Sequence, residues 1–109
     1  MKDESTLITF LGDTPVIRVL DFLLTERDLD FSLTDIAEQS GIGRTTLYRI
    51  WDILLRSAIV VPTRIIGKAK LYKLNANHPA IRKLIELDDI LIKQELRTRA
   101  GKMKIAVPA

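Results

Sequence analysis

The sequence predicts a mainly α-helical chain with one small β-hairpin in its second half and a long C-terminal helix. Two observations carry this prediction. Apolar residues recur at three- and four-residue spacing in several segments, as they do along one face of a helix. One segment, 59–75, is instead rich in strand-forming residues. The length of 109 residues, with 47% hydrophobic and 28% charged residues, fits a single globular domain over 1–109.

The first two predicted helices are marked by their end residues. The first begins at Thr14-Pro15, because threonine is a good N-cap and proline loses no hydrogen bond at the first helical position. Its apolar stripe runs to about residue 26, and 27–31 is predicted to be a loop. The second helix opens at Ser32 with the spacing of a capping box and ends at Gly41, where glycine can adopt the left-handed conformation.

A third helix is predicted from about Arg44 to Ser57, with Gly43 at its N-cap. At 100° per residue, its apolar side chains form one inner stripe, made of Leu47, Trp51 and Leu54. Its opposite side is polar and mostly basic. Ile53 fits neither side. We expect Trp51 to be a core residue rather than a platform for stacking bases.

The segment 59–75 is predicted to form a hairpin, with a turn over Gly67-Lys68-Ala69-Lys70. Pro62 lacks a backbone donor, so the first strand is an edge strand or is kinked there. The last helix is predicted over 79–100, after His78, for which we expect a structural role at the helix start rather than a metal site. Residues 101–109 read as a tail.

A short helix, a glycine-containing turn and a helix with a polar outer face, over about 32–57, together form a helix-turn-helix pattern. The hairpin that follows makes the pattern that of a winged helix. The segment that starts at Leu33 resembles the helix-turn-helix of ArsR-like winged-helix regulators and reads LTDIAEQSGIGRTTLYRIWDILLRSAIV. The small, turn and core positions of that pattern are occupied by Ala37, Gly41, Ile42, Leu47 and Leu54.

The flanking segments, GDTPVIRVLDFLL and YKLNANHPAIRKLIELDD, resemble a group of small winged-helix regulators common in archaea. The resemblance implies a DNA-binding transcriptional regulator. The chain departs from the pattern at Ala58, where many such proteins have glycine, and at Gly43, where serine or threonine is common. Metal-sensing members of the group use cysteine or several histidines. This chain has no cysteine and one histidine, so no metal site is carried over.

The charge is polarised along the chain. Residues 1–42 carry three basic and nine acidic side chains, whereas 43–77 carry seven basic side chains and one acidic side chain. A basic region beside a predicted recognition helix favours contact with a polyanion, here double-stranded DNA, and predicts that the acidic segment faces away from it. The alternative is a solvated surface. The predicted DNA-binding residues are Arg44, Thr45, Thr46, Tyr48, Arg49, Arg64, Lys68, Lys70 and Lys73.

Other classes of function find little support in the sequence. Without cysteine there is no disulfide framework and no thiolate site, and no nucleophile, phosphate-loop or zinc motif is present. Asp35 and Glu38 are explained by helix capping and solvation. We therefore expect no enzyme and no cofactor. The acidic N-terminal segment and the lack of an 18-residue apolar run predict a cytoplasmic protein without an export signal or membrane span.

The last helix carries more apolar residues than one narrow stripe can hold. One stripe consists of Ile81, Leu84, Leu87 and Leu91, and a second of Ile85, Ile92 and Leu96. We expect one of them to cover the core and the other to pair with a second subunit, because monomers rarely expose such patches. The interpretation is a homodimeric, sequence-specific regulator of transcription, with any effector unknown. The competing hypothesis is a winged helix that binds a protein of the transcription or replication machinery.

Overall fold

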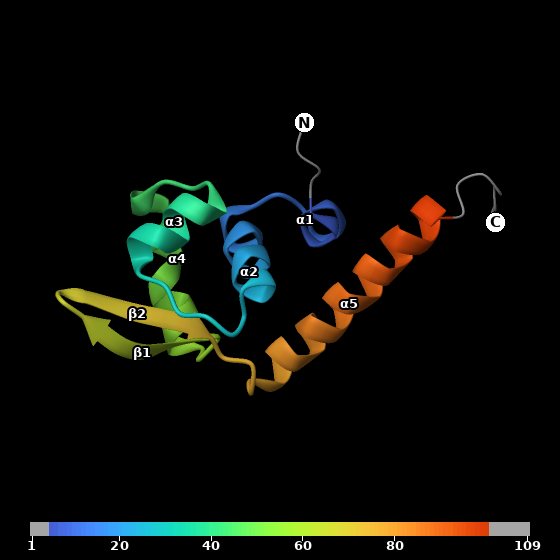
Figure 1. Cartoon of the computed structure of the whole chain (residues 1–109). Coiled ribbons are helices and arrows are strands. Elements are labelled where there is room, and N and C mark those ends of the chain that lie inside the picture. The colour runs from blue at the N-terminus through green and yellow to red at the C-terminus, as the bar shows by residue number, and fades with distance from the viewer. Residues whose placement is uncertain (1–4, 101–109) are drawn as a thin grey trace.

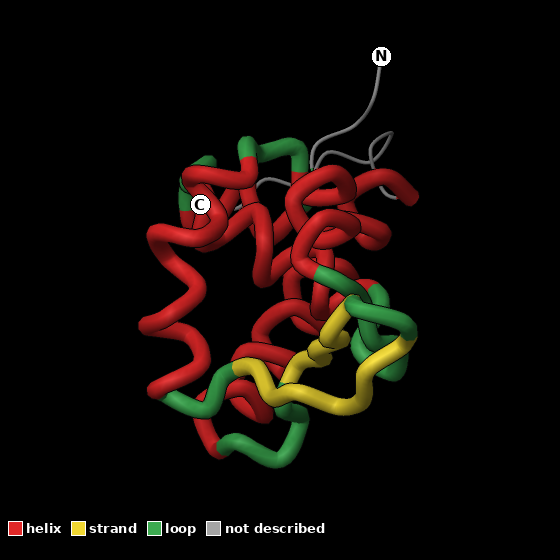
Figure 2. The backbone as a smooth tube through the Cα atoms, turned by 90° about the vertical axis from the view of Figure 1, so that its left-hand side faces the viewer, coloured by secondary structure: helices red, strands yellow, loops and turns green. Residues whose placement is uncertain are grey.

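The structure, a computed structural model, describes residues 5–100 and confirms the predicted fold class (Figure 1). Figure 2 shows the two strands as one hairpin among helices and loops. The molecule is elongated, with extents of 54 × 31 × 21 Å, and places the hairpin and the last helix at opposite ends. The predicted tail 101–109 lies outside the described residues. In chain order the elements are α1 (Thr6–Leu11), α2 (Pro15–Thr25), α3 (Leu33–Ser40), α4 (Arg44–Arg56), β1 (Val60–Ile66), β2 (Ala69–Leu74) and α5 (Pro79–Ala100).

Helices α2 and α3 begin where their capping residues predict. The Thr14 hydroxyl accepts a hydrogen bond from the N–H of Ile17 at 3.2 Å, and Pro15 is the first helical residue. The Ser32 hydroxyl accepts from the N–H of Asp35 at 3.2 Å. Each cap satisfies a backbone donor that has no partner within the helix.

Helix α1 was not predicted, because the sequence analysis placed the first helix at Thr14. Six residues are too few to show a helical apolar stripe, and only Leu7 is buried. The Ser5 hydroxyl caps the helix by accepting from the N–H groups of Leu7 and Ile8. It also donates to a carboxylate oxygen of Asp21 at 2.7 Å, which fastens α1 to α2.

The core lies between α2, α3, α4 and the root of the hairpin. Helix α4 contributes the predicted inner stripe of Leu47, Trp51 and Leu54, all at most 4% exposed. Trp51 meets Tyr72 of β2 edge to face, with ring centroids 5.2 Å apart and planes at 80°. Ile53 is 56% exposed, which agrees with its exclusion from the inner stripe.

The hairpin is antiparallel and irregular at one point. Its register runs from Val60 opposite Leu74 to Ile66 opposite Ala69, with a bulge between Pro62 and Arg64. The bulge agrees with the kink predicted at Pro62, since proline offers no donor to the ladder. The predicted four-residue turn was too long: Gly67 and Lys68 alone form it, and Lys70 lies in β2.

The predicted loop 27–31 ends in a strand-like contact. Phe31 exchanges both backbone hydrogen bonds with Tyr72, at 2.8 and 2.9 Å. Its neighbour Asp30 accepts two hydrogen bonds from the Arg64 guanidinium, at 2.9 and 3.0 Å, and another from the Thr63 hydroxyl. The root of the hairpin is therefore tied to the acidic N-terminal region by backbone and side-chain contacts.

Helix α5 spans the predicted residues and begins at a structural histidine. Nδ1 of His78 accepts from the N–H of Ala80 at 3.1 Å, so the ring proton is assigned to Nε2, which lies 3.1 Å from the carbonyl of Ser57. Within residues 5–100, no helix combines the length and apolar composition needed to cross a bilayer.

The Asp30–Arg64 contact predicts a pH dependence of stability. The pKa of Asp30 is lowered from 3.8 to about 2, most strongly by the hydrogen bond from Arg64 and next by the hydrogen bond from Thr63. A carboxyl with a depressed folded-state pKa stabilises the fold above its unfolded pKa and loses this contribution as pH falls. Asp30→Asn should therefore melt below the unmodified protein at neutral pH, and the gap should shrink between pH 3.8 and about 2.

Circular dichroism melting at pH 7 and near pH 2 checks this expectation. Asp52→Asn is the matched control, because it removes an ion pair with Arg56 whose side chains are both at least 70% exposed. Exposed pairs of this kind contribute little. A melting difference for Asp30→Asn that stays constant with pH would contradict the argument.

Candidate nucleic-acid interface

The turn between α3 and α4 sets the direction in which α4 leaves the core. Gly41 adopts the left-handed conformation, with φ of 71°, and its N–H donates to the carbonyls of Ala37 and Glu38. A Cβ at this position would also lie 3.1 Å from Nη1 of Arg18. Both the backbone angle and the close approach favour glycine. This turn leads into the exposed N-terminal end of α4, and Figure 1 shows the hairpin beside the C-terminal half of the helix.

The first turn of α4 leaves its backbone donors accessible. Gly43 is the N-cap and makes no side-chain cap hydrogen bond, and no described atom lies within 4 Å of the place a Cβ would take. Helix N–H groups at such an end carry partial positive charge and suit a phosphate oxygen. The end of α4 can therefore approach a polyanion closely.

The outer face of α4 is polar and basic, as predicted. Burial of Leu47 and Trp51 turns the opposite side outward, so that Arg44, Thr45, Tyr48 and Arg49 are exposed, while Thr46 is half-buried. Within residues 5–100, Arg44 and Arg49 form no ion pair. Arg56, one further turn along, is paired with Asp52. The two arginines nearest the N-terminal end thus keep their charge and hydrogen-bond donors available.

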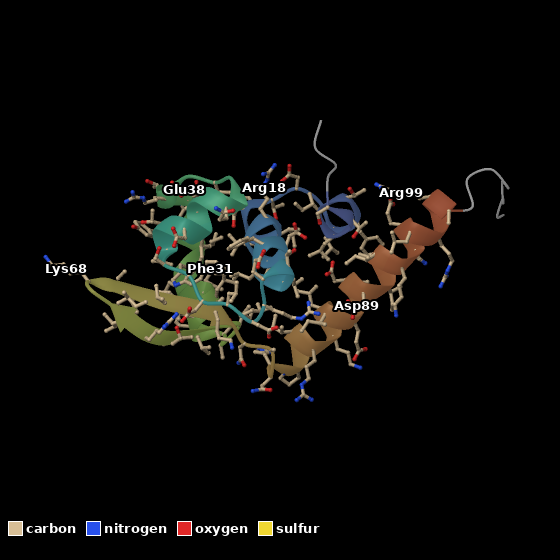
Figure 3. All side chains as sticks on the ribbon, in the orientation of Figure 1. Arg18, Phe31, Glu38, Lys68, Asp89 and Arg99 are labelled. Carbon is tan, nitrogen blue, oxygen red and sulfur yellow. The ribbon has the colours of Figure 1, made fainter. Side chains whose placement is uncertain are left out.

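The four predicted hairpin cations differ in their surroundings. Lys68 stands at the tip of the hairpin (Figure 3), Lys70 is exposed and Lys73 is half-buried. In the described part of the chain, these three lysines have no acidic partner. Arg64 is held by the Asp30 carboxylate, which also raises the pKa of the guanidinium. Its charge is largely balanced, so the three lysines carry the net positive charge of the hairpin.

Asp30 is the residue at this surface that the sequence analysis missed. The acidic segment 1–42 was expected to face away from DNA, yet Asp30 sits at the hairpin root, with its side chain 15% exposed. The pairing joins residues 34 positions apart, and neither the composition nor the helical periodicity indicates it. Its neighbour Phe31, labelled in Figure 3, pairs with Tyr72 of β2, which brings Asp30 to the hairpin only in the folded chain.

The helix and the hairpin are joined into one surface by aromatic packing. Trp51 on α4 and Tyr72 on β2 are both at most 8% exposed and touch edge to face. Their contact fixes how the outer side of α4 stands relative to the hairpin lysines. Asp35 and Glu38 of α3 are exposed, and within the described residues no three His, Asp or Glu side chains are placed to hold a metal ion.

The predicted dimerisation residues of α5 fall into two groups. Ile81 is 3% exposed, and Leu84, Ile85 and Leu91 are partly buried against the same core. Leu87 is half-buried, whereas Ile92 and Leu96 are 43% and 60% exposed. Ile85 thus lies with the core-facing residues rather than with Ile92 and Leu96, the two residues with which the sequence analysis grouped it.

The sequence matches no protein-family model and no curated protein sequence. The structure, in contrast, is similar to solved transcriptional regulators. AntR, an antimony-specific transcriptional repressor, superposes with a TM-score of 0.59 at 21% identity, over 84% of this chain and 78% of AntR. MepR, a regulator of the Staphylococcus aureus multidrug efflux pump MepA, gives 0.62 at 18% identity, over 88% of this chain and 69% of MepR.

A MepR variant bound to an oligodeoxyribonucleotide gives a TM-score of 0.60 at 14% identity, over 93% of this chain and 71% of that one. At these identities the likeness concerns the fold. The narrower resemblance to ArsR-like and archaeal regulators stays a prediction. The chain has the winged-helix fold that these transcriptional regulators share.

Proposed function

We propose that this protein is a homodimeric regulator of transcription that binds double-stranded DNA in a sequence-specific way. The observation that carries the proposal is the bare, basic outer side of α4 beside three unpaired hairpin lysines, with both elements fixed by a shared core. A winged helix that binds a protein partner would not need this concentration of positive charge. We also propose that residues 1–109 act as one domain and that the protein works in the cytoplasm.

In this proposal the N-terminal half of α4 enters the major groove. Arg44 and Arg49 are long enough to reach guanine O6 and N7 in a bidentate contact. Thr45, Thr46 and Tyr48 contact base edges or the phosphates beside them. The hairpin follows the neighbouring backbone through Lys68, Lys70 and Lys73, and Arg64 stiffens the hairpin root while bound to Asp30.

The base-reading role predicts different losses on specific and random DNA. Arg44→Ala or Arg49→Ala should cost ~1–3 kcal/mol of binding to a duplex selected from a random pool, because a bidentate guanine contact is lost. Affinity for random duplex should fall less. Fluorescence anisotropy on both duplexes measures the difference. Equal losses on the two duplexes for both variants would reduce these arginines to phosphate contacts.

The hairpin lysines predict a change in salt dependence. Lys68→Ala combined with Lys70→Ala should weaken binding to all sequences alike and reduce the slope of log K against log salt by ~2, one for each phosphate contact. Lys93→Ala, an exposed change on α5, is the control and should leave the slope as it was. If the double variant keeps the original slope, the hairpin does not touch DNA.

The dimer rests on the apolar residues that α5 leaves uncovered. Ile92 and Leu96 are 43% and 60% exposed on the same side of α5, and Phe10 of α1 is 62% exposed. Phe10 also lines a groove with Leu91 between α1 and α5. Monomeric proteins rarely expose large apolar patches, and a second subunit would cover these side chains. Two-fold symmetry would place two α4 helices ~34 Å apart, which predicts an inverted-repeat binding site.

Charges introduced at the exposed end of α5 should separate the subunits. Ile92→Glu with Leu96→Glu changes side chains outside the core, so the dimer should dissociate while the fold remains. Lys83→Gln, at a side chain 80% exposed, is the control. Sedimentation equilibrium at micromolar concentration decides the point. If the unmodified protein sediments as a clean 12.4 kDa species, both the dimer and the inverted repeat are wrong.

A further inference from the structure

A cleft of about 490 Å³ lies between the C-terminal end of α2 and the middle of α5, away from the outer face of α4. Its accessible apolar side chains are Leu29 and Ile92, which are 53% and 43% exposed, whereas Leu24 behind them is 0% exposed and belongs to the core. Its remaining lining is strongly charged and mostly acidic. The cleft lies away from the proposed DNA-binding surface, and one of its lining residues, Ile92, is also among those that the proposed dimer would cover.

Asp88 is the unusual residue of this cleft. Its side chain lines the cleft and is 8% exposed, and among residues 5–100 it has neither a hydrogen bond nor an ion pair. Burial raises the pKa of Asp88, and the negative charges of Asp21 and Asp89 raise it further, against a lowering by Arg27. A buried acid without a partner is costly, and proteins normally pair such groups.

The surroundings of Asp88 favour a positive charge in the cleft. Glu26, Asp28 and Asp89 also line it, and Asp89 projects from the middle of α5 (Figure 3). The C-terminal end of α2, at Thr25, adds the negative end of a helix dipole. Arg27 is the one lining cation, and its Nη1 donates at 3.0 Å to the carbonyl of Leu24.

We infer that this cleft binds an organic cation, whose ammonium group pairs with the Asp88 carboxylate and whose apolar body packs on Leu29 and Ile92. A metal ion fits less well, because within the described residues no three acidic or histidine side chains converge as ligands. The ammonium group would form a charge-assisted hydrogen bond with the Asp88 carboxylate, which is stronger than a hydrogen bond between neutral groups. This inference does not rest on DNA binding and is tested without DNA.

Three probes of similar shape and different charge provide the test: phenethylamine, the neutral 2-phenylethanol and the anionic 3-phenylpropanoate. Calorimetric titration and methyl chemical shifts of Leu29 and Ile92 report binding to the 109-residue protein. Phenethylamine should bind saturably at millimolar concentration and shift these methyl groups. The neutral and anionic probes should bind at least ~10-fold more weakly, the ratio expected for a hydrogen bond to a charged group.

Asp88→Asn should weaken phenethylamine binding by at least ~10-fold. Glu86→Gln, an exposed change on the same helix, is the matched control and should stay within about twofold of the unmodified protein, because exposed charge pairs contribute little. Asn keeps the shape of the side chain and removes an unpaired buried charge, so this variant should melt no lower than the unmodified protein. Affinity for phenethylamine should also fall as pH drops and Asp88 takes up a proton.

Four results would each overturn the inference. They are no saturable phenethylamine binding, equal binding of the cationic and neutral probes, undiminished binding to Asp88→Asn, and loss of the dimer in Asp88→Asn. The last would show that a cation of a second subunit occupies the cleft. These experiments contain no DNA. Organic-cation binding can therefore fail while DNA binding holds, and DNA binding can fail while organic-cation binding holds.

Discussion

The packing of Tyr72 is the constraint on which the candidate interface depends. Its ring meets Trp51 of α4 edge to face, and its backbone exchanges two hydrogen bonds with Phe31. It also pairs with Pro62 across the hairpin. One residue therefore joins α4, the hairpin and the segment before α3. Because an aromatic pair adds only ~0.5–1.5 kcal/mol beyond its buried area, its main effect here is geometric.

This constraint explains why the charged residues form one surface. Leu47, Trp51 and Leu54 are buried on one side of α4. The helical period therefore puts Arg44, Thr45 and Arg49 on the outer side. The bulge after Pro62 and the Asp30–Arg64 contact fix the base of the hairpin, so that Lys68 lies at its free end. The same packing leaves α5 to extend beyond the core, with exposed apolar side chains and an acidic cleft at its middle.

Local signals in the sequence were sufficient for much of this arrangement. Thr14, Ser32 and Gly41 mark helix ends through their own hydrogen bonds and backbone angles, so neighbouring residues contain the whole signal. Trp51 was placed correctly in the core by helical period. The contact between Asp30 and Arg64 was not predictable in this way, because it depends on how distant segments pack.

Three further features could not be predicted from the sequence, for similar reasons. Helix α1, with its single buried Leu7, is too short to show a period. Two apolar stripes on α5 were visible, but only packing decides which side chains face the core, and it placed Ile85 there. The environment of Asp88 likewise depends on Asp21 and Arg27, which lie far away in the chain. Periodicity thus predicts which residues can be buried, whereas their partners follow from the tertiary fold.

In the proposed function, α4 and the hairpin together neutralise DNA phosphates. A titration of the unmodified protein against random duplex DNA at increasing salt tests it most directly. Two arginines and three lysines form no ion pair within residues 5–100, so the slope of log K against log salt should be steep, reaching about −4.5 per protomer if each meets one phosphate. Binding that is absent, or that does not change with salt, would contradict the account and favour a protein partner.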